Sequence, residues 1–229
     1  MKNISLVFAI TALTGLFSLS VEAAMRDVDF IELCGKGSVR EVERAIRGGA
    51  NVNARQSEGY TPLMIAATTN PDQGVITLLL KSGANINAIQ SQGFTPLMYA
   101  AASNPNPRII TLLIRSGADI NAKQSFGYTA LMVAAIVNSN PDAITLLLKG
   151  GAYVDVRGQS GETALMLAAR SNNNPDVITA LLNGGADINA RSQSGETALM
   201  VAEQYNGNPE VAKILRANMA RKAKPMRRR

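Results

Sequence analysis

A period of 34 residues runs through most of this 229-residue chain. Five glycines mark it, namely Gly59, Gly93, Gly127, Gly161 and Gly195. A Thr follows each glycine at the second position, and Leu, Met and small residues, mostly Ala, then keep the same register. Internal repeats of this length are typical of solenoids, in which each small unit stacks on the next. The period therefore predicts a stacked array instead of a fold with one central core.

Each unit predicts two helices followed by a turn. The run VITLLLKSGANINA recurs in later units, and its Gly83 can adopt the left-handed conformation that ends a helix. The Asn- and Asp-rich stretch after it favours a turn. Between the helices we align Asn70-Pro71, Asn106-Pro107, Asn140-Pro141, Asn174-Pro175 and Asn208-Pro209. Because Asn caps helices and Pro fits their first turn, these pairs predict the start of each second helix.

The composition supports an all-α class. Hydrophobic residues make up 46% of the chain, but aromatic residues only 4%, and Trp is absent. A core must then be built from Ala, Leu, Ile, Val and Met, which suits closely packed helices.

The units resemble ankyrin repeats, whose pattern is G-x-T-P-L-H, then A-A, then L-L-L-x-x-G-A-D-x-N-A. The match covers about residues 25–217, although Met stands where the family usually has His, and an Asn-Pro loop replaces Gly-His. This resemblance implies an all-α ankyrin-repeat solenoid at 24–217. The residue patterns of the two ends predict a signal peptide at 1–23 and a basic disordered tail at 218–229. The six repeats of the solenoid are expected at 25–56, 57–90, 91–124, 125–158, 159–192 and 193–217.

The N-terminal segment has the pattern of a secretory signal. Lys2 precedes an apolar run from Ile4 to about Val21, and small residues precede a cleavage point after Ala23. An uncleaved membrane anchor is the alternative. We expect export to the periplasm or the exterior of a bacterial cell. The single cysteine, Cys34, cannot form an intramolecular disulfide and is expected to be a small buried hydrophobe.

The C-terminal segment is strongly basic. It contains Arg221, Lys222, Lys224, Arg227, Arg228 and Arg229. Such a segment attracts an acidic protein or an anionic membrane surface, or serves only to keep the chain soluble. Nucleic acid is not the expected partner, because no aromatic residues alternate with the charges.

Residues for catalysis are scarce. No His is present, which excludes Ser-His-Asp and Cys-His arrangements and any zinc site that contains His. The glycines follow the repeat and do not form a phosphate-binding loop. The oxygen-rich GADINA turns are weak candidates for Ca²⁺, since the repeat pattern already explains them as turn formers. We therefore expect no enzyme activity, cofactor or metal.

The ankyrin resemblance implies that partners bind at the hairpin tips and the exposed side of the first helix. Directly after the marker glycines come Tyr60, Phe94 and Tyr128, then Glu162 and Glu196, with Phe126 nearby. Aligned aromatic side chains are typical of interface hot spots, although each ring could instead pack on its own hairpin. Neighbouring candidates on the tips are Arg55, Ser57, Glu58, Ser91, Gln92, Lys123, Ser125, Arg157, Gln159, Arg191 and Gln193. On the first helix they are Thr68, Ala102, Ile136 and Arg170.

These patterns predict a non-catalytic scaffold that binds a partner protein through a concave hairpin-tip surface, and we expect a monomer. The alternative is an inhibitor, immunity protein or stabilising accessory protein of one envelope enzyme or toxin. A secreted effector directed at a host also remains open.

Overall fold

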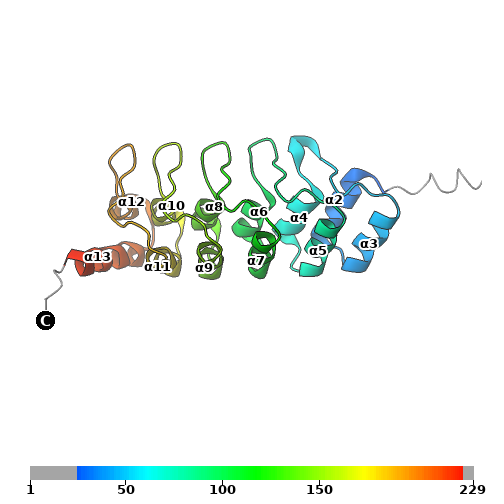
Figure 1. The fold of residues 1–229 in the computed structure, drawn as a ribbon. Helices are drawn as coiled ribbons and strands as arrows, with labels where there is room; N and C mark the ends of the chain where they lie inside the picture. Colours follow the sequence, from blue (N-terminus) through cyan, green and yellow to red (C-terminus); the bar gives the residue numbers. More distant parts are fainter. Residues whose placement is uncertain (1–24, 224–229) are drawn as a thin grey trace, which may run out of the picture.

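The computed structural model describes residues 25–223, with side chains to Arg221. This segment of the chain folds into six helix pairs (Figure 1). The pairs are α2 (Asp27–Lys36) with α3 (Val39–Arg47), α4 (Pro62–Thr69) with α5 (Gln73–Lys81), α6 (Pro96–Ser103) with α7 (Arg108–Arg115), α8 (Ala130–Val137) with α9 (Pro141–Lys149), α10 (Ala164–Ser171) with α11 (Pro175–Asn183), and α12 (Ala198–Tyr205) with α13 (Pro209–Ala223). A short 3-10 helix, η1 (Ser57–Gly59), precedes α4. The all-α solenoid of stacked pairs is confirmed, whereas the predicted signal peptide lies outside the described residues.

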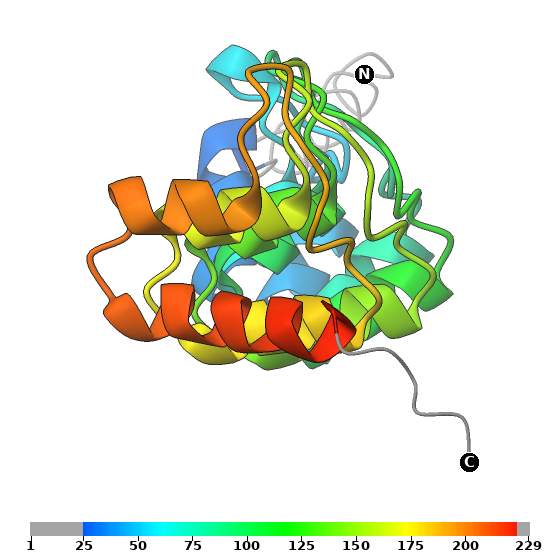
Figure 2. The same cartoon turned by 90° about the vertical axis from the view of Figure 1, so that its left-hand side faces the viewer.

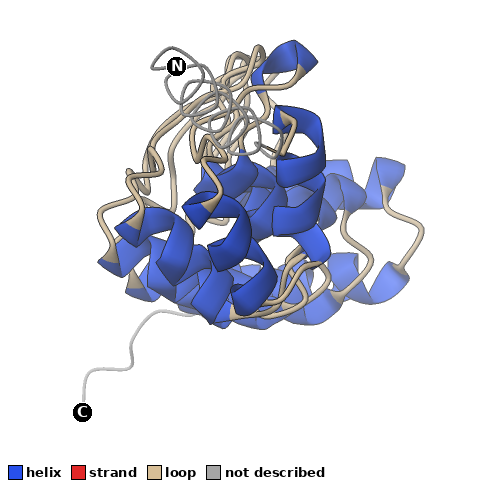
Figure 3. Cartoon of the chain, turned by 90° about the vertical axis from the view of Figure 1, so that its right-hand side faces the viewer, coloured by secondary structure: helices blue, strands red, loops and turns tan. Residues whose placement is uncertain are grey.

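The pairs stack in two helical layers. The first helices, from α2 to α12, lie side by side in one layer, and the second helices, from α3 to α13, form the other. We call them the inner and outer helices. Seen along the array, the loops superimpose beyond the inner helices, on the side away from the outer helices (Figure 2). We call the side formed by these loops and the exposed inner-helix residues the inner face. The described residues contain helices and loops but no strand (Figure 3).

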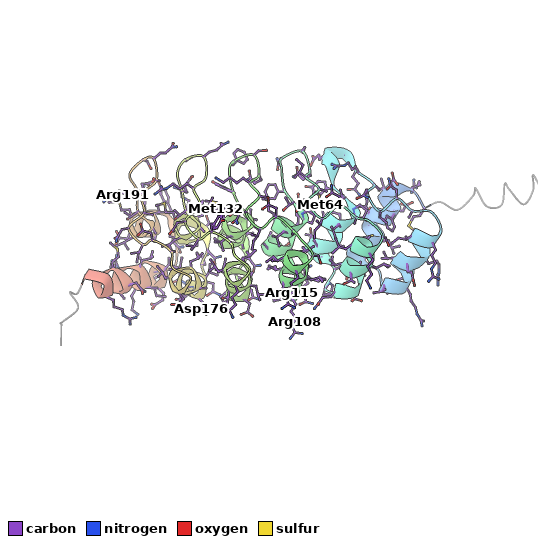
Figure 4. The ribbon with its side chains drawn as sticks, in the orientation of Figure 1. Met64, Arg108, Arg115, Met132, Asp176 and Arg191 are labelled. Carbon is purple, nitrogen blue, oxygen red and sulfur yellow. The ribbon has the colours of Figure 1, made fainter. Side chains whose placement is uncertain are left out.

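The core lies between the units and is built from small and aliphatic side chains. In α6, Leu97, Met98, Ala100 and Ala101 are buried, and the equivalent residues of the neighbouring inner helices are buried too. Outer helices contribute residues such as Ile110 and Leu113, which are fully buried. Met64 and Met132 lie in the inner-helix layer, while Arg108, Arg115 and Asp176 lie on the outer helices (Figure 4). Ala lets adjacent helices approach closely, which explains how a stable core forms with few aromatic residues.

Each inner helix after the first begins with a Thr cap. In α4 the hydroxyl of Thr61 accepts a hydrogen bond from the backbone N–H of Met64, and Pro62 occupies the first helical position. The same Thr contact recurs at the starts of α6, α8, α10 and α12. Since a Thr cap satisfies an N–H group that the helix leaves unpaired, the regular Thr fixes where each inner helix begins.

One predicted cap is wrong. The sequence alignment made Asn70-Pro71 the start of the second helix, but Asn70 lies at the end of α4, and Asp72 caps α5. The structural equivalent of Asn70 is Asn104, whereas Asn106 accepts the N–H of Arg108, the first residue of α7. The prediction failed because it aligned Asn70-Pro71 with Asn106-Pro107, although the 34-residue period aligns Asn70 with Asn104.

An Asn at the end of each inner helix after α2 joins neighbouring units; Asn70, Asn104 and Asn172 are buried, and Asn138 and Asn206 are half-buried. Asn172 donates hydrogen bonds from Nδ2 to the carbonyl oxygens of Ala135, at 3.1 Å, and Asn138, at 3.0 Å, and its Oδ1 accepts one from the N–H of Asn174. The same residues in other units are Asn70, Asn104, Asn138 and Asn206. We call these five residues the Asn ladder. It takes the place of the family's usual Gly-His loop and satisfies buried carbonyl groups.

The first unit follows the same plan in shortened form. Asn70 donates to the carbonyl oxygens of Cys34 and Gly37, as Asn104 does to those of Ala67 and Asn70. Cys34 therefore occupies the place of the second Ala of later units, and it is fully buried as predicted. Burial raises the pKa of its thiol to about 12.

The last helix is longer than predicted. The expected tail began at residue 218, but α13 continues to Ala223, so the prediction of disorder is wrong for 218–223. Met219 packs against the core, and Asn218 donates to the carbonyl oxygen of Ile214 within the helix. The sequence RANMARKA also favours helix, which ends two residues before Pro225. Within residues 25–223 no helix is both long and apolar enough to span a membrane.

Candidate partner-binding surface

The loop tips form a continuous hydrogen-bonded ridge along the inner face. The N–H of Ser125 donates to the carbonyl oxygen of Gln92 at 2.9 Å. Equivalent bonds join Ser91 to Glu58, Gln159 to Phe126, and Gln193 to Ser160. The marker glycines permit this stacking: Gly127 has a φ of 79°, and a Cβ there would lie 3.2 Å from the backbone nitrogen of Gln159. The glycine that defines the period is therefore needed for close contact between loops.

The basic tip residues predicted to bind a partner also make hydrogen bonds to loop carbonyls. Arg55 donates to the carbonyl oxygen of Ile89 at 3.0 Å, and Lys123 to that of Arg157 at 3.2 Å. Arg157 reaches the carbonyl oxygens of Gly161 and Arg191, while Arg191 binds the Gly195 carbonyl of its own loop. These side chains are exposed, and one nitrogen of each donates to a loop carbonyl. They are therefore less free to bind a partner than their exposure suggests.

Some polar tip residues also donate to neighbouring loops, whereas others do not. Ser125 donates to Gln92, Gln159 to the Ser125 carbonyl, and Gln193 to the Gln159 carbonyl. Ser91 donates only to Gln90 of its own loop. Ser57, Glu58 and the side chain of Gln92 are exposed at the tips. The predicted role of all these residues in binding stays a prediction.

The Asn and Asp oxygens of the turns are also occupied. Asn53 Oδ1 accepts the N–H of Asn85 at 2.8 Å, and Asp155 accepts that of Asp187 at 3.0 Å. Between residues 25 and 221, no group of three or more Cys, Asp or Glu residues is placed to hold a metal ion. The turn oxygens therefore serve to connect loops.

Three aromatic rings gather at the N-terminal half of the inner face. Tyr99 of α6 lies between Tyr60 and Phe94, with ring centroids 5.7 and 5.6 Å away. Gln90 donates to the Tyr99 hydroxyl at 3.2 Å. Burial and the neighbouring Tyr60 hydroxyl raise the pKa of Tyr99. Two rings of the predicted row thus belong to a single cluster, centred on a residue that the sequence analysis did not select.

The middle of the inner face is its most apolar region. Phe126 at the loop tip is 57% exposed, and Val137 at the end of α8 is 60% exposed. Ile136 and Tyr128 of the same unit are half-buried. These residues all come from the unit of α8 and α9, and we call them together the central patch. It contains Phe126, Tyr128, Ile136 and Val137.

Charged residues follow the central patch in the next two units. The guanidinium of Arg170 lies 3.9 Å from the carboxylate of Glu196 and 4.9 Å from the ring centroid of Tyr205. Burial raises the pKa of the Tyr128 hydroxyl, and the negative charge of Glu162 raises it further. Of the first-helix candidates, Arg170 is exposed, and Thr68, Ala102 and Ile136 are half-buried.

The comparison with known families agrees with this architecture. A family model described as ankyrin repeats (3 copies) matches residues 30–124, 97–192 and 131–226. The chain belongs to the ankyrin repeat family. No curated protein matches it. An ankyrin repeat domain is typically a non-catalytic module that binds other proteins, so the family supports a protein-binding scaffold without naming the partner.

Proposed function

We propose that this ankyrin repeat protein is a scaffold that grips a partner protein through its inner face, with the central patch as the main anchor. The observation that carries the proposal is the exposure of Phe126 and Val137 beside half-buried Tyr128 and Ile136. A rigid repeat array leaves such a patch uncovered by its own chain. Large apolar side chains in the centre of an interface supply most of its binding energy.

The proposal keeps the predicted residues Phe126 and Tyr128 in the anchor but leaves out most of the other predicted tip residues. Arg55, Lys123, Arg157 and Gln159 contribute to loop stacking, so their truncation would disturb the array as well as any contact. The ring cluster around Tyr99 offers a second apolar contact, although its members pack on one another. Action in the periplasm or outside the cell also belongs to the proposal, and it rests on the sequence pattern of residues 1–23.

The test is affinity capture from an envelope extract with protein that begins at Ala24. We expect the wild type to capture one protein, and the double variant Phe126→Ser with Val137→Ser to lose it. The matched control is Tyr153→Ser, because Tyr153 is 69% exposed but lies where the loop leaves α9. Truncating a hot-spot residue costs about 2 kcal/mol or more, so each single variant should bind the purified partner at least about 30-fold more weakly and the double variant about 700-fold more weakly.

Other outcomes would change the proposal. Equal binding by the double variant and the wild type would contradict a role for the central patch. Binding that survives the double variant but disappears when residues 224–229 are removed would assign recognition to the basic segment. Loss of one specific envelope activity on deletion of the gene would favour the inhibitor or accessory alternative.

A further inference from the structure

One loop of the inner face differs from the others at its base. Gly158 stands where other units have Gln56, Gln90, Gln124 and Ser192. Its φ is not in the left-handed region, so the backbone does not require glycine. A Cβ on Gly158 would lie 2.7 Å from Tyr128 Cε1 and 3.4 Å from Glu162 Oε2. The missing side chain therefore lets the Tyr128 ring and the Glu162 carboxylate occupy the same corner.

The Glu162 carboxylate in this corner has no basic partner among residues 25–221. Its Oε2 is buried and accepts no hydrogen bond, and no Lys or Arg nitrogen of residues 25–221 lies within 4.0 Å of it. The basic side chains around it are engaged elsewhere: Arg170 with Glu196 and Tyr205, and Arg157 with loop carbonyls. A covered acceptor without a donor is costly. Oε2 itself is covered, but Glu162 as a whole is half-buried, so a charged donor from outside can come close to the carboxylate and offset some of that cost.

We propose that Tyr128 and Glu162 form a socket for a Lys or Arg side chain of the partner protein. The carboxylate supplies the opposite charge, and the aromatic ring beside it favours a cation through its π face. The central patch begins at Tyr128 itself, so the partner segment carries an apolar residue for Phe126 and Val137 next to its basic residue. This inference rests on the proposed function and adds the chemistry of the segment that is bound.

The experiment selects ligands from a random 12-residue peptide library displayed on phage. Wild-type protein from Ala24 onward should select peptides in which Lys or Arg stands near a large apolar residue. Glu162→Gln should lose the preference for Lys and Arg but keep the apolar preference. The matched control, Asp142→Asn, removes one negative charge from outer helix α9 and should select as the wild type does. Circular dichroism of each variant shows that it is folded.

A double-mutant cycle then measures the contact directly. The tightest selected peptide is synthesised with its Lys or Arg and with norleucine at that position. Loss of the basic group should weaken binding to the wild type about tenfold, which corresponds to about 1.4 kcal/mol, and binding to Glu162→Gln less than about twofold.

Each outcome separates the two ideas. Peptides with an apolar preference but no basic preference would overturn the socket and leave the scaffold function standing. Equal effects of norleucine on the wild type and on Glu162→Gln would overturn it too. If the wild type selects no peptide and captures no protein, the socket and the inner-face binding function both fail.

Discussion

The Asn ladder gives a quantitative test of what holds the units together. We expect Asn172→Ala to lower the free energy of unfolding by about 3 kcal/mol. The side chain is 4% exposed and makes three hydrogen bonds, two to carbonyl oxygens of the preceding unit and one from the N–H of Asn174. A net contribution of about 1 kcal/mol for each bond gives this sum, and unpaired groups left buried would raise it.

The neighbouring residue supplies the control. Asn173 is exposed, and the structure gives its side chain no hydrogen bond, so Asn173→Ala should change stability by less than about 0.5 kcal/mol. Urea unfolding followed by far-ultraviolet circular dichroism measures both variants. In a chain of this size the loss at Asn172 should lower the Tm by roughly 6–12 °C. If Asn172→Ala were as stable as Asn173→Ala, the ladder would contribute nothing to stacking and this reasoning would be refuted.

Two further predictions concern the ends of the array. Because burial raises the pKa of Cys34 from 9.0 to about 12, its thiolate fraction near pH 8 falls about a thousandfold. A disulfide reagent should therefore modify the native protein far more slowly than the urea-unfolded protein. Equal rates would show that the first unit opens readily. Met219 packs on the core in the part of α13 that continues beyond residue 217, so Met219→Ala should destabilise the protein by about 1–2 kcal/mol in the same urea assay. The control Lys213→Ala, at an exposed position, should cost less than about 0.5 kcal/mol.

Much of the fold follows from repetition in the sequence. Thr61, Leu63 and Gly83 recur at the same place in later units, so the sequence shows each position several times. Such repetition is too regular to arise by chance. The caps, the small-residue core and the turn glycines could therefore be predicted from general helix chemistry. The register of Asn70 was mispredicted because it was aligned by its Asn-Pro pair, whereas the 34-residue period aligns it with Asn104, as the structure does.

The candidate site was predicted less well than the fold. Ile65, Val133 and Leu167 stand at the position equivalent to Tyr99 in other inner helices, and these residue types predict a core position. Tyr99 is nevertheless the centre of the ring cluster. The period shows that Arg55 and Arg157 share a position, but it does not show that both point at a carbonyl of the next loop. Whether an exposed side chain contacts its own array or remains available depends on the distance between units, which the sequence does not contain.

The hydrogen bonds that the Asn ladder makes between units all run in one direction along the chain. Each donor side chain lies in a later unit than the carbonyl oxygens it contacts, from Asn70 with Cys34 to Asn206 with Ala169. During synthesis the N-terminal unit emerges first. Each newly emerged Asn then finds its acceptors already in place on the unit before it. These bonds suit assembly from the first unit onward, at the pace at which the ribosome delivers the chain.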